Sequence, residues 1–569
     1  MLKKWTLAVV LLLPALTGQI NESMACTNIL VTKGASTDGS TFVSYAADSH
    51  DLYGELYYWP GQDWAPGSML TVKEWDTGKY MGQIAQASRT YTVIGNMNEH
   101  QVTIGETTYG GRPELVDTTA IIDYGSLIYI ALQRARNARE AIQVMTSLVD
   151  EYGYYSSGES FSIADAEEAW IMEMIGKGPG NTGAVWVAVK IPDGYVSAHA
   201  NQARITTFTL EDEKTSISSR NINKLFNPSI EVVYSQDVIS FAREKGYFDG
   251  KNKDFSFADA YAPLDYSAIR FCEARVWSAF RLMNPEMDKY QSFILGESTE
   301  RMPLFIKPAK PVSVRDVMSI MRDHFEDTPL AMTDDPGAGP YGVPYRWRPL
   351  TWEVDGETYF NERAIATQQT GFSFVAQMRS WLPNPIGGIF WFGVDDANST
   401  VYVPMYIGMN SIPENFAVGN GNLLEFSWNS AFWVFNWVAN QAYHRYSFMI
   451  EDIRKQQKQL EDQFASFGPV IDQTARTLYE KDPALARQFL TEYVHNQART
   501  TFETWKKLGE FLMVKYLDGN LHEEKDGQFL RNEHGNPAHA KFPGYSDEYY
   551  KKVAEETGDH LKMKELPKE

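Results

Sequence analysis

The sequence predicts a layered α+β fold for residues 26–439, with an export segment before it at 1–25 and a helical extension after it at 440–569. Three observations support this prediction. Short strand-like runs flank a helical stretch without the strict strand–helix alternation of a doubly wound sheet. The chain has a helical pattern from residue 430 onward. Hydrophobic residues make up 43% of the chain and aromatic residues 13%, which is enough to bury a large core.

The first 25 residues have the pattern of a secretory signal. Lys3 and Lys4 precede an apolar run at 5–16, which is shorter than the about 20 residues that a membrane span needs. Residues 23–25 read Ser-Met-Ala, with small side chains at the first and third positions as signal peptidase accepts, so a cut after Ala25 leaves Cys26 first. An earlier cut by signal peptidase, followed by removal of a short propeptide, gives the same mature N-terminus. The sequence leaves open whether signal peptidase or self-cleavage exposes Cys26. We expect an exported, periplasmic or secreted protein with no transmembrane segment after processing.

A lipid anchor on Cys26, as in bacterial lipoproteins, is the alternative. Ser23 and Met24 stand where such sites usually carry Leu and a small residue. A strand-like segment at 27–32 follows at once, without the polar tether that an anchored domain needs. The pattern therefore favours a free Cys26.

The first elements predicted in the domain are strands. The spacing of apolar and turn residues predicts strands at 26–32 and 41–48 around a turn at 37–40, and a second pair at 91–95 and 102–107.

A helical pattern then covers residues 126–152. Asn137 with Glu140 resembles a capping box, so we expect two helices that meet at Asn137. Four short strands in hairpin spacing follow at 160–164, 169–174, 185–190 and 195–200. Asp165 and Glu168 lie at a hairpin turn, where turn chemistry is expected rather than catalysis.

The second half has fewer clear signals. Helices with Ser at the N-cap are expected at 235–245 and 313–325. Strands are expected at 372–377, 388–393 and 400–405. After residue 430 the chain is predicted to be helical to its end, with one apolar face running from 489 to 516. We interpret this extension as a packing or dimerising surface, so a homo-oligomer is one expectation.

Charge and cysteine content exclude several classes of protein. The chain has 52 basic and 73 acidic residues, a net charge of −21, which argues against nucleic acid as a partner. Two cysteines close at most one loop, so this is not a disulfide scaffold. Cys272 is expected to be a buried structural thiol. A bond between Cys26 and Cys272 would block a Cys26 nucleophile, so both are expected to be reduced.

A chain that starts with Cys26 has its own nucleophile and its own base. A free α-amino group titrates at about 7.7–8.0 and a thiol at about 8.5, so the amine can take the thiol proton. His50, His100 and His199 are scattered, and the HExxH, Walker, GxSxG and CxxC patterns are absent. No metal or cofactor is therefore expected.

Residues 26–40 read CTNILVTKGASTDGS and closely resemble the mature start of the C69 family of dipeptidases. These are N-terminal nucleophile (Ntn) hydrolases, distantly related to penicillin V acylases and bile salt hydrolases. Further matches lie at 95–98, 163–165, 168–170, 200–205, 275–277 and 385–391. The resemblance covers roughly residues 26–430. It implies the αββα Ntn fold, cleavage of short peptides with a free N-terminus, and trimming of a precursor to expose Cys26.

The resemblance also implies roles for single residues. Cys26 matches the nucleophile and, through its amine, the base. Asp48 matches the acid that orients the amine, and Asn201 matches the amide that donates to the oxyanion, a contact worth roughly 3–4 kcal/mol. Arg275 and Arg270 are alternative matches for the arginine that supports the nucleophile.

Each of these residues also has an ordinary structural interpretation. Asp48 and Asn201 could be turn residues and the arginines could be scaffold ion-pair partners. Relatives often carry Arg-Asn ahead of the acid, whereas residues 45–48 here read Tyr-Ala-Ala-Asp.

Three functions remain open from the sequence. The leading one is an exported cysteine dipeptidase that acts through a Cys26 thioester on short peptides. The second is an N-acyl amide hydrolase of the penicillin V acylase or bile salt hydrolase kind. The third is a lipid-anchored surface binding protein with an aromatic groove. The sequence does not locate the pocket that sets side-chain preference.

Overall fold

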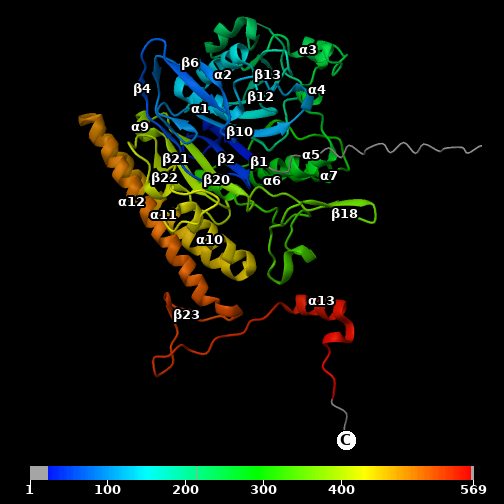
Figure 1. Cartoon of the computed structure of the whole chain (residues 1–569), viewed down its shortest axis with the longest axis vertical. Coiled ribbons are helices and arrows are strands. Elements are labelled where there is room, and N and C mark those ends of the chain that lie inside the picture. The colour runs from blue at the N-terminus through cyan, green and yellow to red at the C-terminus, as the bar shows by residue number, and fades with distance from the viewer. Residues whose placement is uncertain (1–23, 213, 566–569) are drawn as a thin grey trace, which may run out of the picture.

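Two large β-sheets stacked against each other form the centre of the computed structural model, which describes residues 24–212 and 214–565 (Figure 1). The predicted export segment lies outside the described residues except for its last two positions. Within the described part of the chain, no helix is both long and apolar enough to cross a membrane.

The first sheet has seven antiparallel strands with β1 near its middle. Its order is β17 (Phe305–Ile306), β14 (Val196–His199), β1 (Met24–Val31), β2 (Thr41–Ser49), β20 (Thr370–Met378), β21 (Ile389–Val394) and β22 (Val403–Tyr406). The predicted strands at 26–32 and 41–48 are confirmed as neighbours. Their register pairs Cys26 with Ala47 and Ala25 with Asp48, which brings the predicted nucleophile and the predicted acid to the same end of the sheet.

The second sheet has nine strands, and most neighbours run antiparallel. Its order is β15 (Ser216–Ser218), β16 (Val232–Tyr234), β13 (Ala184–Lys190), β12 (Ala169–Gly176), β11 (Gly158–Ala164), β10 (Thr103–Gly110), β9 (Met97–Asn98), β8 (Val93–Ile94) and β3 (Tyr58–Trp59). Two-stranded hairpins at its margin are β4 (Gln62–Asp63) with β7 (Arg89–Thr90) and β5 (Met69–Lys73) with β6 (Tyr80–Ala85).

A polar layer joins the two sheets. His199 on β14 is fully buried, with Nε2 2.7 Å from Ser162 Oγ and Nδ1 2.7 Å from Thr107 Oγ1 on the second sheet. Asn28 on β1 donates to Ser162 Oγ at 3.2 Å, and its side chain occupies the space beside Gly105. The missing Cβ of Gly105 therefore lets β1 and β10 approach closely.

Helices cover the outer faces of both sheets, which confirms the predicted α+β class (Figure 1). α1 (Tyr124–Arg134) and α2 (Ala138–Tyr152) pack on the nine-stranded sheet. The predicted break at Asn137 is confirmed, because its side chain accepts from the backbone N–H of Glu140 at 2.9 Å and starts a new helix. The other short helices are α3 (Val238–Glu244), α4 (Phe257–Tyr261), α5 (Tyr266–Ala268), α6 (Ala274–Met283), α7 (Gln291–Ile294), α8 (Val314–Ile320) and α9 (Asn384–Gly387).

Three local predictions are corrected. β14 does not form a hairpin with β13. It pairs with β1 in the other sheet, where Thr32 Oγ1 accepts from the N–H groups of Gly194 and Tyr195 and fixes the turn before it. α3 is not capped by Ser235, whose hydroxyl instead accepts from the Trp186 N–H. α8 has the predicted Ser313 cap but ends at Ile320.

Three helices come after the last strand of the seven-stranded sheet in the chain. They are α10 (Ala431–His444), α11 (Tyr446–Lys481) and α12 (Pro483–Lys515). Arg379, just after β20, forms an ion pair with Asp472 on α11, and Trp505 of α12 stacks on Phe435 of α10 at 4.8 Å between ring centroids. The boundary predicted at 439/440 falls inside α10, so α10 runs directly from the sheet domain into the long helices.

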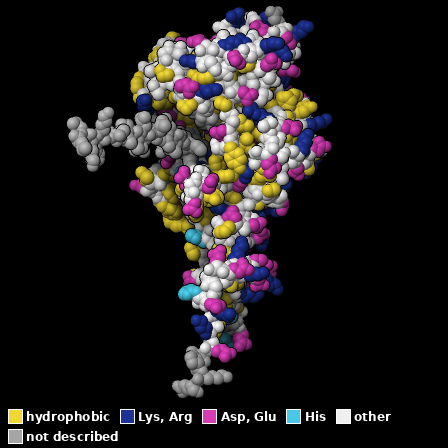
Figure 2. Space-filling model, turned by 90° about the vertical axis from the view of Figure 1, so that its right-hand side faces the viewer, with side chains coloured by type: hydrophobic (Ala, Val, Ile, Leu, Met, Phe, Trp, Pro, Cys, Tyr) yellow, Lys and Arg dark blue, Asp and Glu magenta, His cyan; other side chains and the backbone are white. Residues whose placement is uncertain are grey.

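The predicted helical pattern stops at residue 515. Beyond it the described chain has a small hairpin, β23 (Glu524–Lys525) with β24 (Gln528–Phe529), and a short α13 (Asp547–Thr557). A further hairpin, β18 (Thr351–Val354) with β19 (Glu357–Phe360), projects near α6 (Figure 1). Figure 2 shows acidic and basic side chains interspersed over one face, including the narrow C-terminal part.

Candidate active site

Cys26 lies near the start of β1, an inner strand of the seven-stranded sheet, and is buried, with 1% of its surface exposed. The strand-forming residues that follow it place β1 between β14 and β2, and Cys26 itself pairs with Ala47 of β2. Cys272, the other cysteine, is also buried and free, as predicted.

Arg275 contacts Cys26 from the first turn of α6. Its Nη1 donates to the carbonyl oxygen of Cys26 at 2.6 Å and to Thr27 Oγ1 at 2.8 Å. Its Nη2 donates to the carbonyl oxygen of Ala200 at 3.2 Å and to Asn201 Oδ1 at 2.9 Å. The guanidinium is fully buried, and these neutral oxygens replace the water it has lost.

Arg270 lies elsewhere. It forms an ion pair with Glu362, and its guanidinium lies 5.0 Å from the centroid of the Phe360 ring. Of the two alternatives left open by the sequence, the structure brings Arg275 to the backbone of Cys26 and Arg270 to the β18–β19 hairpin.

Asn201 follows β14 in a left-handed conformation, with φ of 61°. Its Oδ1 accepts from the backbone nitrogen of Cys26 at 2.8 Å, and its Nδ2 donates to the carbonyl oxygen of Thr108 at 2.6 Å. The sequence predicts an Nδ2 that donates to an oxyanion. In the structure that group is used by Thr108, and Asn201 instead holds the nitrogen of Cys26.

Asp48 lies at the end of β2, opposite Ala25 in the strand register. Its Oδ1 accepts from Thr370 Oγ1 at 2.7 Å, whereas its buried Oδ2 has no hydrogen-bond partner among the described residues. Burial raises the pKa of the Asp48 carboxyl to about 7, against the opposing effect of the positive charge on Arg363. The carboxyl therefore has an acceptor oxygen to spare next to the residue that precedes Cys26.

The thiol has two neighbours that the sequence interpretation missed. Cys26 Sγ lies 3.6 Å from Tyr45 Oη and 3.6 Å from Glu106 Oε1, and the Tyr45 hydroxyl donates to the same Glu106 oxygen. Burial raises the pKa of the Cys26 thiol well above its usual range, and the negative charges of Glu106 and Asp48 raise it further. The one signal for Glu106 was an acid inside the strand-like run at 102–107.

A ring-lined cavity lies beside Tyr45 and Glu106, with about 390 Å³ of empty space that includes its open mouth. Most of its wall is aromatic, and the lining residues are Tyr45, Tyr57, Trp59, Trp75, Gly95, Asn96, Glu106, Tyr124, Gly125, Ile128, Tyr129 and Phe372. Two of its walls are stacked pairs, Tyr57 on Trp59 and Trp59 on Tyr129. We name it the aromatic pocket.

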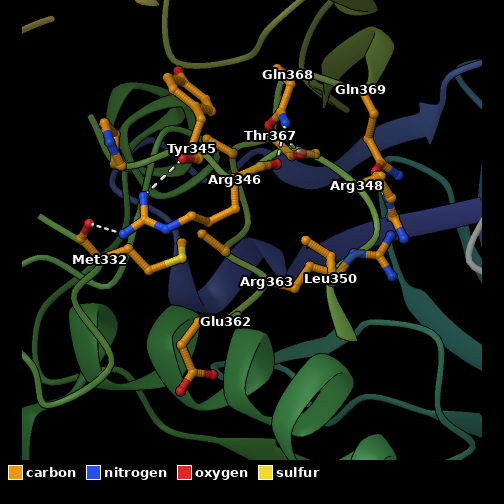
Figure 3. A pocket seen from close by; sticks show the side chains of 13 residues that line it. Met332, Tyr345, Arg346, Arg348, Leu350, Glu362, Arg363, Thr367, Gln368 and Gln369 are labelled. Atoms are coloured by element: carbon orange, nitrogen blue, oxygen red, sulfur yellow. Dashed lines mark hydrogen bonds between the residues drawn. The ribbon is translucent and has the colours of Figure 1, made fainter. Parts of the chain in front are cut away.

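A second cavity of about 330 Å³ is lined by residues of the loop between 332 and 369 (Figure 3). Arg346 donates to the carbonyl oxygens of Met332 and Tyr345 and so ties this loop together (Figure 3). Arg363 also lines it, and its buried Nε and Nη2 have no hydrogen-bond partner among the described residues. Burial lowers the pKa of Arg363 to about 9, while the charge of Asp48 acts in the opposite direction.

The sequence model of peptidase family C69 matches residues 25–58 and 59–459 of this chain, well over half its length. The chain belongs to peptidase family C69. It is therefore a peptidase, and the C69 match begins next to Cys26 and ends within α11.

Several proteins are similar to this C69 chain over most of their length. A probable dipeptidase of Salmonella dublin is 24% identical over 407 residues, covering 68% of this chain and 82% of that protein. A probable dipeptidase of Latilactobacillus sakei is 25% identical, covering 69% of this chain and 76% of that protein. A dipeptidase of Bifidobacterium longum is 24% identical, covering 68% and 72%.

Other residues considered from the sequence lie apart from Cys26. Asp165 accepts from the N–H groups of Glu167 and Glu168, which is the predicted turn chemistry, and also from the N–H of Ala138 at the start of α2. Within residues 24–212 and 214–565, no group of three or more His, Cys, Asp or Glu side chains is arranged to hold a metal ion.

Proposed function

We propose that this C69 peptidase is an exported dipeptidase with Cys26 as its nucleophile. One observation carries the proposal: Asn201 and Arg275 hold the nitrogen and the carbonyl oxygen of Cys26, while its thiol faces Glu106 beside the aromatic pocket. The backbone of the residue is fixed from both sides, and its thiol contacts Tyr45 and Glu106, two residues that line the aromatic pocket, as a positioned nucleophile requires.

Removal of residues 1–25 is part of the proposal. In the uncut chain the nitrogen of Cys26 belongs to a peptide bond and cannot act as a base. Cleavage turns it into an amine next to the space that Ala25 occupied, where the free Oδ2 of Asp48 can accept a hydrogen bond from the ammonium form. Asn201 Oδ1 already accepts a hydrogen bond from the same nitrogen.

The chemical steps follow from these contacts. The neutral amine takes the proton of the thiol, directly or through one water, and the thiolate attacks the peptide carbonyl carbon. When the tetrahedral intermediate collapses, the C–N bond breaks, the ammonium returns the proton to the leaving amine, and a thioester to Cys26 remains. Water, deprotonated by the amine, then hydrolyses the thioester and regenerates the thiol. The raised pKa of the thiol makes the adjacent base necessary.

The fold supports the same proposal. Two large sheets that stack on each other, with helices on both outer faces, are compatible with the αββα sandwich of Ntn hydrolases. The names of the similar proteins support a dipeptide substrate. Burial of Cys26 in the sheet, where it pairs with Ala47 of β2, favours a free terminus over a lipid anchor, because an acylated Cys26 would have to leave the sheet.

N-terminal sequencing and intact mass of the exported protein test the proposal, together with Cys26→Ala and Cys26→Ser. We expect a mature chain that starts at an unmodified Cys26 and hydrolyses dipeptides, and no measurable hydrolysis by Cys26→Ala. A propeptide retained only in Cys26→Ala would assign the trimming to self-cleavage. A diacylglyceryl group on Cys26, or wild-type rates in Cys26→Ala, would overturn the proposal. Faster cleavage of N-acylated amino acids than of dipeptides would replace it with the acylase function.

A further inference from the structure

We propose that Glu106 binds the α-ammonium group of the substrate, and that the side chain of the substrate's first residue enters the aromatic pocket. The inference rests on the proposed dipeptidase function and adds to it the group that recognises a free N-terminus. It also names the substrate class: short peptides whose first residue is large and apolar.

Glu106 is a buried acid whose second oxygen meets no cationic or N–H donor. It lies in the middle of β10, and 1% of its surface is exposed. Its Oε1 accepts from the Tyr45 hydroxyl and lies 3.6 Å from Cys26 Sγ. Its buried Oε2 has no N–H or hydroxyl donor among the described residues, and its one polar neighbour is the carboxyl of Glu159, whose pKa burial and Glu106 raise well above the usual range. A buried carboxylate that faces only another acid is unfavourable unless a cation joins it.

The position of Glu106 fits an ammonium group on the substrate. In a peptide, the α-nitrogen lies about 2.5 Å from the carbonyl carbon of the same residue, because only the Cα separates them. That carbonyl carbon is the atom that the Cys26 thiolate attacks. A carboxylate within 3.6 Å of the sulfur is therefore within reach of the ammonium of a bound peptide.

The aromatic pocket fits an apolar side chain on the same residue. It borders Glu106, and the rings of Tyr57, Trp59 and Tyr129 form part of its wall. Gly125 at the start of α1 allows this wall, because a Cβ there would lie 2.3 Å from Cγ of Trp75. An apolar side chain that enters the pocket gains the free energy of leaving water.

Binding of an ammonium would also favour the reactive form of Cys26. The negative charge of Glu106 is one of the causes that raise the pKa of the thiol. A bound cation offsets this charge and so stabilises the thiolate. A substrate with a blocked or missing amine lacks this effect as well as the contact itself.

The test compares leucyl-alanine with its des-amino analogue, 4-methylpentanoyl-alanine, on mature wild type, Glu106→Gln and Glu173→Gln. Glu173 is the control. It is also a buried glutamate of the nine-stranded sheet, on β12, but its carboxylate accepts from the backbone N–H groups of Arg204 and Ile205 and it lines neither cavity.

We expect wild type and Glu173→Gln to prefer the free amine strongly. In Glu106→Gln, kcat/KM for leucyl-alanine should fall about 30-fold or more, the loss of one charge-assisted contact. The value for the analogue should not fall, because the analogue makes no such contact and removal of the Glu106 charge lowers the pKa of the thiol. Glu106→Asp keeps the charge but moves it farther from the substrate. Its kcat/KM for leucyl-alanine should therefore lie between the values of wild type and Glu106→Gln. An unchanged preference in folded Glu106→Gln would overturn the inference, as would a wild type that cleaves both compounds equally well.

A second arm tests the pocket. Ile128→Phe narrows it from α1 and should lower kcat/KM for leucyl-alanine and phenylalanyl-alanine but not for glycyl-alanine. Equal effects on all three would overturn the assignment of the pocket. If wild type cleaves no dipeptide at all, the proposed function fails. If it cleaves them without regard to the amine, only the inference fails.

Discussion

Arg275 Nη1 donates a 2.6 Å hydrogen bond to the carbonyl oxygen of Cys26, a residue 249 positions earlier in the chain. The same guanidinium also reaches Thr27, Ala200 and Asn201, so one buried side chain ties the start of β1 to the end of β14. α6 thus fixes the backbone of Cys26, the proposed nucleophile, without touching its sulfur. Arg275 is in this sense a positioning residue.

Replacing Arg275 by Lys should lower kcat for dipeptides about 100-fold or more. Lysine has a single nitrogen with three donors, so it cannot reproduce a planar fork that reaches four oxygens. Arg270→Lys is the matched control and should keep most of the activity, because Arg270 pairs with Glu362 on the β18–β19 side. Steady-state kinetics with thermal melts separate a positioning effect from unfolding. Equal losses in the two variants would contradict the different places of the two arginines.

Asp48→Asn should lower the pKa of the Cys26 thiol in the uncut chain, because the charge of Asp48 raises it. The pKa of Asp48 is about 7, so the two proteins should differ above pH 7 and converge below pH 6, where Asp48 is protonated. The measurement is the pH dependence of iodoacetamide modification, followed by mass spectrometry of the Cys26 peptide so that Cys272 does not contribute. Asp395→Asn serves as control, because Asp395 bonds to Asn436 on α10 instead. Identical profiles for Asp48→Asn and wild type would refute the electrostatic link.

His199 should make the protein sensitive to mild acid. Burial lowers the pKa of His199 to about 3. Below pH 6.5 the unfolded state therefore binds a proton that the folded state does not, and the free energy of unfolding decreases as the pH is lowered. Relative to His199→Gln, wild type should lose about 2 kcal/mol of unfolding free energy between pH 6.5 and pH 5. Urea denaturation of both proteins at the two pH values measures this difference. A parallel loss in wild type and variant would show that other groups cause the acid sensitivity.

Trp505→Ala should destabilise the whole protein by about 3–5 kcal/mol, because Trp505 is fully buried and stacks on Phe435 of α10. Trp505→Phe keeps a ring in this contact and should lose much less. It also removes an indole N–H that has no hydrogen-bond partner among the described residues. The measurement is the loss of dipeptide hydrolysis as the temperature is raised. If Trp505→Ala loosened α12 but changed neither the rate of dipeptide hydrolysis nor the melting temperature of the activity, α12 would be an independent appendage.

The features that the sequence determined by itself are local. The export pattern and the strand directly after Cys26 are read from adjacent residues. The cap at Asn137 divides α1 from α2 through a hydrogen bond to Glu140, three positions along the chain. Such signals depend on short-range sterics and hydrogen bonding, which neighbours in sequence largely set. The α+β class follows from their order.

The tertiary structure alone decided which side chains surround the sulfur. Arg270 and Arg275 give the same signal in sequence, but they face different surroundings, and only one meets Cys26. Glu106 comes to the thiol from 80 residues away, through the packing of two sheets that no local pattern encodes. The same packing excludes water from Glu106, Asp48 and Cys26. Their charges therefore act on one another at short range in surroundings of low dielectric constant, which a sequence cannot show.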